Sequence, residues 1–267
     1  MPRLAFLGAG NLASALVDGL LATGVRPGEI SCLSGSGKTA AALAARTGIT
    51  PAASLETLLD RADVLVVAFK PQHLAAADPR LAELTAGKLV VSVLAGKKLA
   101  TLAKNFPHAR NLIRAMPNTP AAIGAAITPW CALHPPTTAD RAAVESLLGA
   151  CGQHLELGEE HMDAVTALSA GGPAFLYEFV AALRDAGIAA NLPPEISARL
   201  SVETVLGAAR LLARRGVDPE VLRNQVTSPN GTTLAGLKKM EAGNFRGAVR
   251  EAILAAQARA AELSRDS

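Results

Sequence analysis

A short apolar segment, Leu4–Leu7, leads directly into the pattern Gly8-x-Gly10-x-x-Ala13 and then into a run with helical periodicity. In this pattern Gly8 permits a tight turn, Gly10 lets the backbone approach a pyrophosphate, and Ala13 lets helix and strand pack closely. The phosphates then face the free N–H groups of the new helix. Because the pattern follows the first strand, it predicts a Rossmann-type dinucleotide-binding fold. An ordinary strand-to-helix turn of small residues is the alternative.

The end of the second predicted strand, Ile30–Leu33, indicates which dinucleotide is bound. An NAD site usually has an acid about 20 residues beyond the glycines, where it accepts hydrogen bonds from the adenosine ribose. Here no Asp or Glu occurs between positions 29 and 56, and the strand is followed by Ser34, Ser36 and Lys38, separated by glycines. Hydroxyls and a cation can donate to a ribose 2′-phosphate, which an acid would repel. We therefore expect NADPH; NADH and a solvated Gly/Ser turn are the alternatives.

Apolar strand-like runs alternate with helical patterns over the first 158 residues, which is typical of βαβ units around a mostly parallel sheet. The predicted strands are Leu4–Leu7, Ile30–Leu33, Val64–Ala68, Leu89–Leu94, Arg110–Met116 and Ala125–Pro129. Their carboxyl ends should line the ligand crevice. From Glu159 onward only helix-period segments occur. The predicted fold class is α/β, with a Rossmann-type dinucleotide-binding domain over 1–158 and an all-helical dimerisation and substrate domain over 159–267.

Two segments of the helical half, Pro173 to Ala190 and Glu195 to Arg214, are apolar around much of their circumference. Such helices must be buried in a core or against a second subunit. A domain of about one hundred residues cannot bury both alone, so we expect a homodimer, or a larger homo-oligomer, formed through this half.

The composition limits the classes of partner and compartment. The chain has 267 residues and a formal net charge of only +3, without a dense Lys/Arg stripe, which argues against a nucleic-acid surface. No uninterrupted apolar run reaches the length of a membrane span, and the first strand begins too early for a signal peptide. Cys32, Cys131 and Cys151 form no C-x-x-C pair, and the five histidines form no spaced metal pair. We expect a cytoplasmic protein with reduced cysteines, no membrane partner and no metal.

Four further segments carry a resemblance: Val67–Gln72, Arg114–Pro120, Asp163–Pro173 and Ser228–Leu237. Together with the glycine-rich start, they closely resemble the Δ1-pyrroline-5-carboxylate reductase family, in the same order and over nearly the whole chain. The resemblance implies reduction of a cyclic imine, L-1-pyrroline-5-carboxylate, to L-proline with NADPH or NADH, as the last step of proline biosynthesis. It also implies dimerisation through intertwined helical domains that build the substrate pocket.

The expected cofactor-binding residues lie at the glycine turn and at the ends of the following strands: Gly8, Gly10, Asn11, Leu12, Ser34, Ser36, Lys38, Ala68, Lys70, Pro71, Ala95 and Asn118. For Lys70, a solvated lysine at a strand end is an equal alternative. Asn118 lies between two prolines, where its amide can face the nicotinamide carboxamide or close an Asx-turn.

The segment Ser228–Thr233 turns and starts a helix, so its free N–H groups can hold a substrate carboxylate without any arginine. The resemblance implies that the substrate-binding residues are Ser228, Asn230, Gly231, Thr232, Thr233 and Gly172. Among these, Thr233 is the expected catalytic residue, because its hydroxyl would bind the ring nitrogen and orient the iminium or help deliver its proton. The alternative is that Thr232 or Thr233 serves only as a helix N-cap.

The chain departs from the family pattern at several positions. Ala170 and Gly171 stand where the family commonly has Gly-Ser, Val217 stands where it tends to have an acid, and Arg223-Asn224 replaces a frequent Lys-Asp. These changes leave the substrate open, so a relative acting on another cyclic imine is one alternative. A β-hydroxyacid dehydrogenase is a second, although the lysines at 238 and 239 match no catalytic motif of that class. A non-catalytic NADP-binding sensor is the third.

Overall fold

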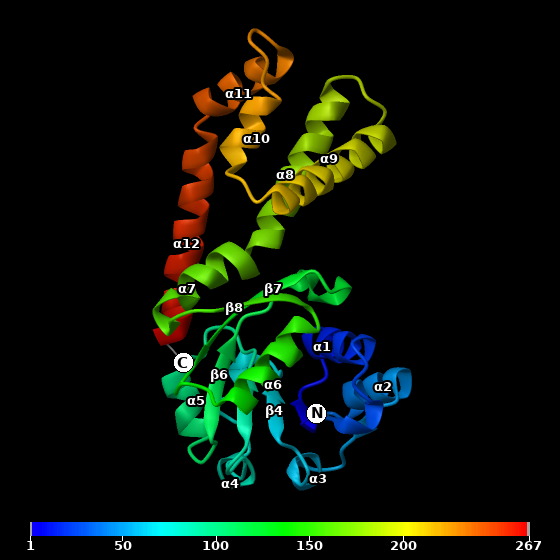
Figure 1. Ribbon diagram of the computed structural model, residues 1–267, viewed down its shortest axis with the longest axis vertical. Helices are drawn as coiled ribbons and strands as arrows, with labels where there is room; N and C mark the ends of the chain where they lie inside the picture. The colour runs from blue at the N-terminus through cyan, green and yellow to red at the C-terminus, as the bar shows by residue number, and fades with distance from the viewer. Residues whose placement is uncertain (1, 266–267) are drawn as a thin grey trace. The chain divides into compact units, whose positions relative to one another are not determined.

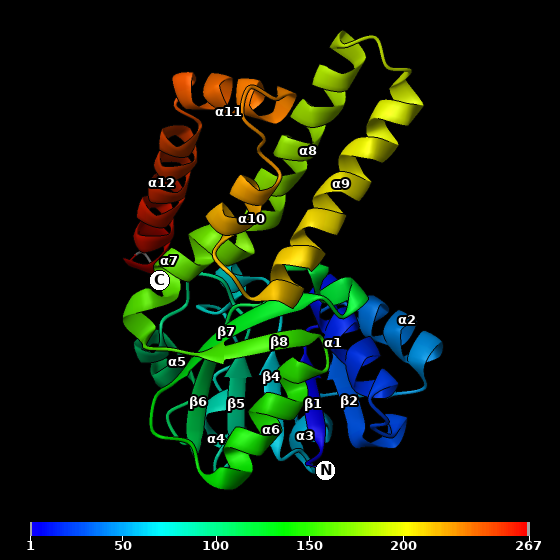
Figure 2. The same ribbon diagram turned by 45° about the horizontal axis from the view of Figure 1, so that its top comes forward.

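The computed structural model describes residues 2–265 and divides the chain into two compact units. Unit 1 comprises the chain up to Gly171 together with the segment from Ala256, and unit 2 comprises Gly172–Ala255. Figures 1 and 2 show a sheet covered by helices in unit 1 and helices alone in unit 2. The predicted fold class is therefore confirmed. The domain division after residue 158 stays a prediction, since residues 159–171 group with unit 1 in their contacts.

An eight-stranded sheet forms the centre of unit 1, in the order β3-β2-β1-β4-β5-β6-β7-β8. The strands are β1 (Leu4–Leu7), β2 (Ile30–Leu33), β3 (Thr50–Pro51), β4 (Val64–Val67), β5 (Leu89–Ser92), β6 (Asn111–Ala115), β7 (Ala126–Ala132) and β8 (Gly152–Glu156). The first six are parallel, β7 runs antiparallel to β6, and β8 runs parallel to β7. The strand order reverses between β1 and β4, where open α/β sheets bind their ligands.

Helices cover both faces of the sheet because its central strands are apolar at successive positions. In β4, Val64 and Val66 belong to one buried cluster, and Leu65 and Val67 belong to the other. The first cluster includes side chains of α1 (Asn11–Ala22), α2 (Lys38–Thr47) and α6 (Thr138–Gly149), and the second those of α3 (Leu55–Leu59), α4 (Leu81–Leu84) and α5 (Leu99–Asn105). The short helix α7 (Met162–Val165) and a π-helical turn, Thr166–Ala170, then lead towards unit 2.

Two strands lie outside the predicted set. β3 has only two residues, and β8 is a half-exposed edge strand with the sequence Gly-Gln-His-Leu-Glu. Neither has the apolar run from which a strand is predicted. β7 also continues to Ala132, beyond the predicted end at Pro129, because its antiparallel pairing with β6 extends that far.

The three cysteines are buried in unit 1 and free, as predicted. Burial raises the pKa of the Cys131 thiol to about 12 and that of the Cys151 thiol to about 11. Since the thiolate is the reactive form, these side chains act as packing groups.

Unit 2 is built from helices joined by short turns. They are α8 (Gly172–Ala189), α9 (Pro194–Arg215), α10 (Pro219–Gln225), α11 (Thr232–Ala242) and α12 (Phe245–Arg265), the last of which ends in unit 1. The helices α8 and α9 pack closely, and the Ser197 hydroxyl donates to the Arg184 carbonyl at 2.6 Å. Both helices nevertheless keep large apolar side chains exposed: Phe175, Leu176, Tyr177, Ile188, Ile196, Leu200, Leu206 and Leu211. The single chain does not bury the apolar faces of these two helices.

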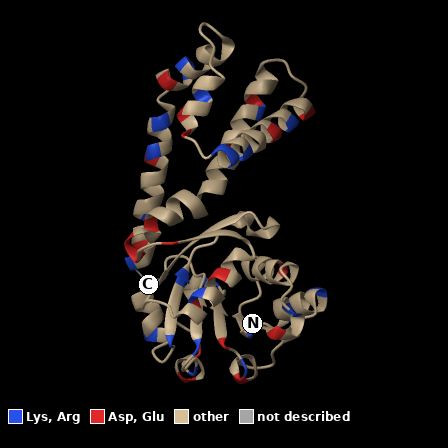
Figure 3. Cartoon of the chain, in the orientation of Figure 1, with Lys and Arg blue, Asp and Glu red and all other residues tan. Residues whose placement is uncertain are grey.

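One helical stretch, Glu159–Ala189, is apolar and long enough to cross a membrane, judged by length and composition alone. It includes Glu178, Arg184 and Asp185, so its apolar run is interrupted, as Figure 3 shows by the few coloured turns along α8. Very little of it is buried inside the chain. An unburied apolar helix face is also what a subunit interface requires.

A buried arginine in β6 holds the segments that lead out of unit 1 and back into it. Arg114 is 3% exposed, and its guanidinium lies 3.2 Å from the Glu159 carboxylate and 3.6 Å from that of Asp163. Glu159 also accepts the Leu99 N–H, at the start of α5, at 2.7 Å. Asp163 accepts the hydroxyl of Ser264, near the end of α12, at 2.9 Å. Arg114 is therefore paired with the segment Glu159–Asp163, and through these two carboxylates it is connected to the start of α5 and the end of α12.

Candidate active site

The glycine turn connects β1 to α1 at the carboxyl edge of the sheet. Gly8 has a φ of 117°, and a Cβ at this position would lie 2.6 Å from the Phe69 nitrogen, so only glycine fits. At Gly10 a Cβ would meet no atom within 4 Å, so the backbone there borders open space. Gly10 is also the N-cap of α1, which leaves the N–H groups of Asn11 and Leu12 without helical partners. The turn therefore offers free backbone donors beside an open space, as phosphate binding requires.

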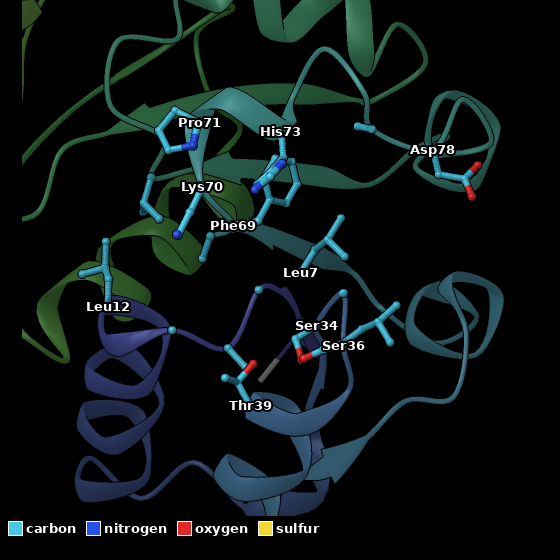
Figure 4. A pocket seen from close by; sticks show the side chains of 18 of the residues that line it. Leu7, Leu12, Ser34, Ser36, Thr39, Phe69, Lys70, Pro71, His73 and Asp78 are labelled. Atoms are coloured by element: carbon cyan, nitrogen blue, oxygen red, sulfur yellow. The ribbon is translucent and has the colours of Figure 1, made fainter.

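A cavity of about 950 Å³ lies in front of this turn. Nine of the predicted cofactor residues line it: Gly8, Gly10, Asn11, Leu12, Ser34, Ser36, Ala68, Lys70 and Pro71. Figure 4 shows Lys70, Pro71 and His73 across the cavity from Ser34, Ser36 and Thr39. Its volume lies near the upper end of the range of about 300 to 1,000 Å³ for pockets that hold small molecules and cofactors. The residues present thus fit a dinucleotide.

The turn after β2 forms one corner of this cavity. The Ser34 hydroxyl accepts the Ala40 N–H at 3.1 Å, which fixes the turn against the first turn of α2. Ser36 and Thr39 line the cavity, whereas Lys38, the first residue of α2, does not. Thr39 was absent from the predicted set. The helix α2 begins at residue 38, so Thr39 lies in its first turn beside the cavity. Prediction of this helix start from the sequence could have identified Thr39 as a lining residue.

The segment after β4 forms the opposite wall, and it contributes residues that sequence reasoning missed: Phe69, His73, Ala76, Ala77, Asp78 and Leu81. The Asp78 carboxylate lies 2.6 Å from Arg80, whose hydrogen bonds hold the pKa of Asp78 below its usual value. The acid on this wall is therefore ionised and already paired. The segment Val67–Gln72 covers only the start of this wall, and no sequence pattern marked the lining residues from His73 onward.

Ala95 and Asn118, two further predicted cofactor residues, do not line the cavity either. Ala95 is exposed beyond the end of β5, where Val93 is the lining residue. The Asn118 amide oxygen accepts the Ile127 N–H at 3.1 Å, and its amide nitrogen donates to the Ser169 carbonyl at 3.3 Å. The side chain therefore closes no Asx-turn and instead bridges two distant segments of unit 1.

The predicted substrate turn lies in unit 2. The Gly231 N–H donates to the Ser228 carbonyl at 3.1 Å, and Asn230 between them has a φ of 59°. Pro229 followed by a positive φ is the pattern of a type II turn. A Cβ on Gly231 would overlap the Ser228 hydroxyl, so a larger residue there would require the Ser228 side chain to move. The sixth predicted substrate residue, Gly172, begins α8, and a Cβ there would meet no atom within 4 Å.

The N-cap of α11 is Gly231, so neither Thr232 nor Thr233 occupies the capping position. The cap makes no side-chain hydrogen bond. The first intrahelical bond runs from Ala235 N–H to the Gly231 carbonyl, which leaves the N–H groups of Thr232, Thr233 and Leu234 without helical partners. The alternative that either threonine serves only as an N-cap is therefore wrong. The helix start offers backbone donors to an anion and leaves the Thr233 hydroxyl outside the cap.

Family models match both halves of the chain. The model described as pyrroline-5-carboxylate reductase dimerisation matches residues 159–263, and the model described as NADP oxidoreductase coenzyme F420-dependent matches residues 3–96.

Whole-chain relatives agree with this assignment. The pyrroline-5-carboxylate reductase of Arabidopsis thaliana is 38% identical over 98% of this chain and 95% of its own length. A solved pyrroline-5-carboxylate reductase from Coxiella burnetii is 32% identical, covers 98% of both chains and superposes with a TM-score of 0.93. The Plasmodium falciparum pyrroline carboxylate reductase, solved with NADP bound, is 26% identical over 98% of both chains, with a TM-score of 0.86. The predicted resemblance is confirmed: this chain belongs to the pyrroline-5-carboxylate reductase family.

Proposed function

We propose that this protein reduces L-1-pyrroline-5-carboxylate to L-proline with NADPH, in the cytoplasm and as the last step of proline biosynthesis. The observation that carries the proposal is the family assignment over the whole chain, combined with a glycine turn and cavity suited to a dinucleotide. We also propose residues 1–158 and 159–267 as the functional division of the chain, and the family model that begins at residue 159 supports it.

The chain's own groups fit the two charges of the substrate. The free N–H groups at the start of α11 are suited to the substrate carboxylate, because they combine unpaired donors with the positive end of the helix dipole. The Thr233 hydroxyl is assigned to the ring nitrogen, where it would orient the iminium and hold its proton. NADPH held by the residues of the cavity would supply a hydride to the carbon of the protonated imine, whose C=N bond would become a single bond while the nitrogen keeps its proton.

The cofactor is expected to be NADPH, preferred over NADH by roughly tenfold in kcat/KM, as for one charge-assisted hydrogen bond. The reason is that the turn after β2 has hydroxyls and a cation where an acid would select NADH. Steady-state rates with each cofactor measure this ratio. Ser36→Ala should reduce the preference because Ser36 lines the cavity, and Lys38→Ala should reduce it through the loss of a positive charge at the start of α2, next to that wall. Equal efficiency of both cofactors with the unmodified chain would contradict the assignment.

We also propose that α8 and α9 form the interface of an obligate homodimer or of a larger homo-oligomer. Their exposed apolar side chains and the dimerisation model over residues 159–263 support this. Light scattering at micromolar concentration should give a mass of at least two chains. A monomer that is stable and active at that concentration would refute the proposal.

The central test is turnover of chemically prepared L-1-pyrroline-5-carboxylate, followed by the loss of NADPH absorbance. Formation of L-proline at a rate proportional to enzyme concentration is the expected result. Turnover of only a different cyclic imine, or of a β-hydroxyacid, would replace the proposed substrate. NADPH binding without turnover of any of these compounds would identify a sensor instead.

A further inference from the structure

Asn118 bonds to a backbone group that the sequence leaves without its ordinary helical donor. In an α-helix the Ser169 carbonyl would accept the N–H of the residue four positions later, but that residue is Pro173, which has none. The Asn118 side chain donates to this carbonyl at 3.3 Å. A proline in one segment therefore creates an acceptor that a side chain 51 residues away satisfies.

The backbone at this acceptor also departs from a regular helix. Residues Thr166–Ala170 form a π-helical turn, in which the Gly171 N–H donates to the Thr166 carbonyl at 3.0 Å. π-Helical turns inside α-helices are rare and frequently mark functional sites. The hydroxyl of Ser169 is buried and, within residues 2–265, has no hydrogen-bond partner, so the local geometry is not set by that side chain.

The other end of the Asn118 amide is bound to the sheet. Its oxygen accepts the N–H of Ile127, the second residue of β7, at 3.1 Å. The two hydrogen bonds fix the orientation of the amide plane, because oxygen and nitrogen each have a defined partner. The side chain thus joins β7 to the π-helical turn, and both partners belong to unit 1.

We propose that Asn118 is a positioning residue for imine reduction. It holds the π-helical turn Thr166–Ala170 to β7 through the Ser169 carbonyl, which Pro173 leaves without its α-helical donor. The inference rests on the proposed function, because that turn directly precedes Gly172, which the family resemblance assigns to the substrate pocket. A displacement of about 1 Å in a positioning element can reduce the rate of a bound reaction by up to about a hundredfold. Asn118 acts here through Ser169, and it does not line the cavity in front of the glycine turn.

The test compares Asn118→Leu, which removes both hydrogen bonds, with Asn118→Asp, which keeps the acceptor for Ile127 but loses the donor to Ser169. Both variants should lower kcat by roughly tenfold, the equivalent of one lost hydrogen bond, and leave the dissociation constant of NADPH within about twofold. Hydrogen exchange at the Gly171 amide should become roughly tenfold faster in both. Asn105→Leu is the matched control, because the Asn105 amide also donates to a backbone carbonyl, that of Thr101, but within α5. This control should keep the wild-type kcat.

A double-mutant cycle with Pro173→Ala separates positioning from general stability. Alanine at 173 returns an N–H to the Ser169 carbonyl, so the loss caused by Asn118→Leu should be several-fold smaller in that background. Equal losses in both backgrounds, or weakened NADPH binding with unchanged exchange at Gly171, would overturn the proposal and return Asn118 to the cofactor site. The exchange measurement needs no turnover, so failure of the proposed substrate leaves this test intact.

Discussion

Arg114→Met is expected to lower the free energy of unfolding by about 3 kcal/mol. Removal of one partner from a buried ion pair typically costs about 3 to 5 kcal/mol, because the remaining charge stays poorly solvated. Here the remaining carboxylates, Glu159 and Asp163, are 32% and 23% exposed, so water partly compensates them and the lower end of the range applies. Urea denaturation followed by circular dichroism measures the change, provided that the transition is two-state and the protein concentration is fixed.

The matched control is Arg246→Met. Arg246 pairs with Glu220, but the two side chains are 74% and 51% exposed. Such exposed pairs contribute about 0 to 1 kcal/mol, so this variant should unfold close to the wild-type midpoint. Equal effects of the two substitutions would mean that the Arg114 cluster contributes no more than a surface ion pair and does not anchor the segments around it.

Sequence reasoning succeeds where a local backbone requirement leaves a residue signature. Gly8 could be interpreted because a tight turn with a positive φ favours glycine, and the structure has that φ at Gly8. Gly10 could be interpreted because a phosphate needs an open approach to the backbone, and the backbone at Gly10 borders open space. The run Val64–Val67 could be interpreted because a strand buried on both faces is apolar throughout. The family could be assigned because several such segments occur in a fixed order.

The same reasoning fails where a side chain's role depends on register or on distant partners. The charge of Lys38 marks it as a cofactor residue, but the cavity wall contains its neighbour Thr39, which the charge pattern does not indicate. The partners of Asn118 are Ile127 and Ser169, and neither is adjacent to it in sequence. β8 gave no signal because a half-exposed edge strand does not need an apolar run. The amino-acid pattern thus determines elements and turns more directly than it determines contacts between them.

Thr233→Val is expected to lower kcat/KM for the imine by roughly one to two orders of magnitude, the range for one positioned polar group in proton transfer. Valine keeps the shape of threonine and removes only the hydroxyl. The N-cap of α11 is Gly231 and makes no side-chain hydrogen bond, so the substitution removes no cap. The free energy of unfolding should therefore change by no more than about 0.5 kcal/mol. The dissociation constant of NADPH should stay within about twofold of wild type, since Thr233 is assigned to the substrate alone.

Thr233→Ser provides the decisive comparison, because it restores the hydroxyl and removes a methyl group. If the hydroxyl binds the ring nitrogen, the serine variant should recover most of the activity that the valine variant loses. Steady-state kinetics at saturating NADPH and varied imine concentration measure both. If valine and serine reduce kcat/KM equally, the methyl group and not the hydroxyl is what the reaction needs. If folded Thr233→Val reduces the imine at the wild-type rate, the proton on nitrogen comes from solvent or arrives with an already protonated substrate, and the backbone N–H groups of α11 alone account for substrate binding at this turn.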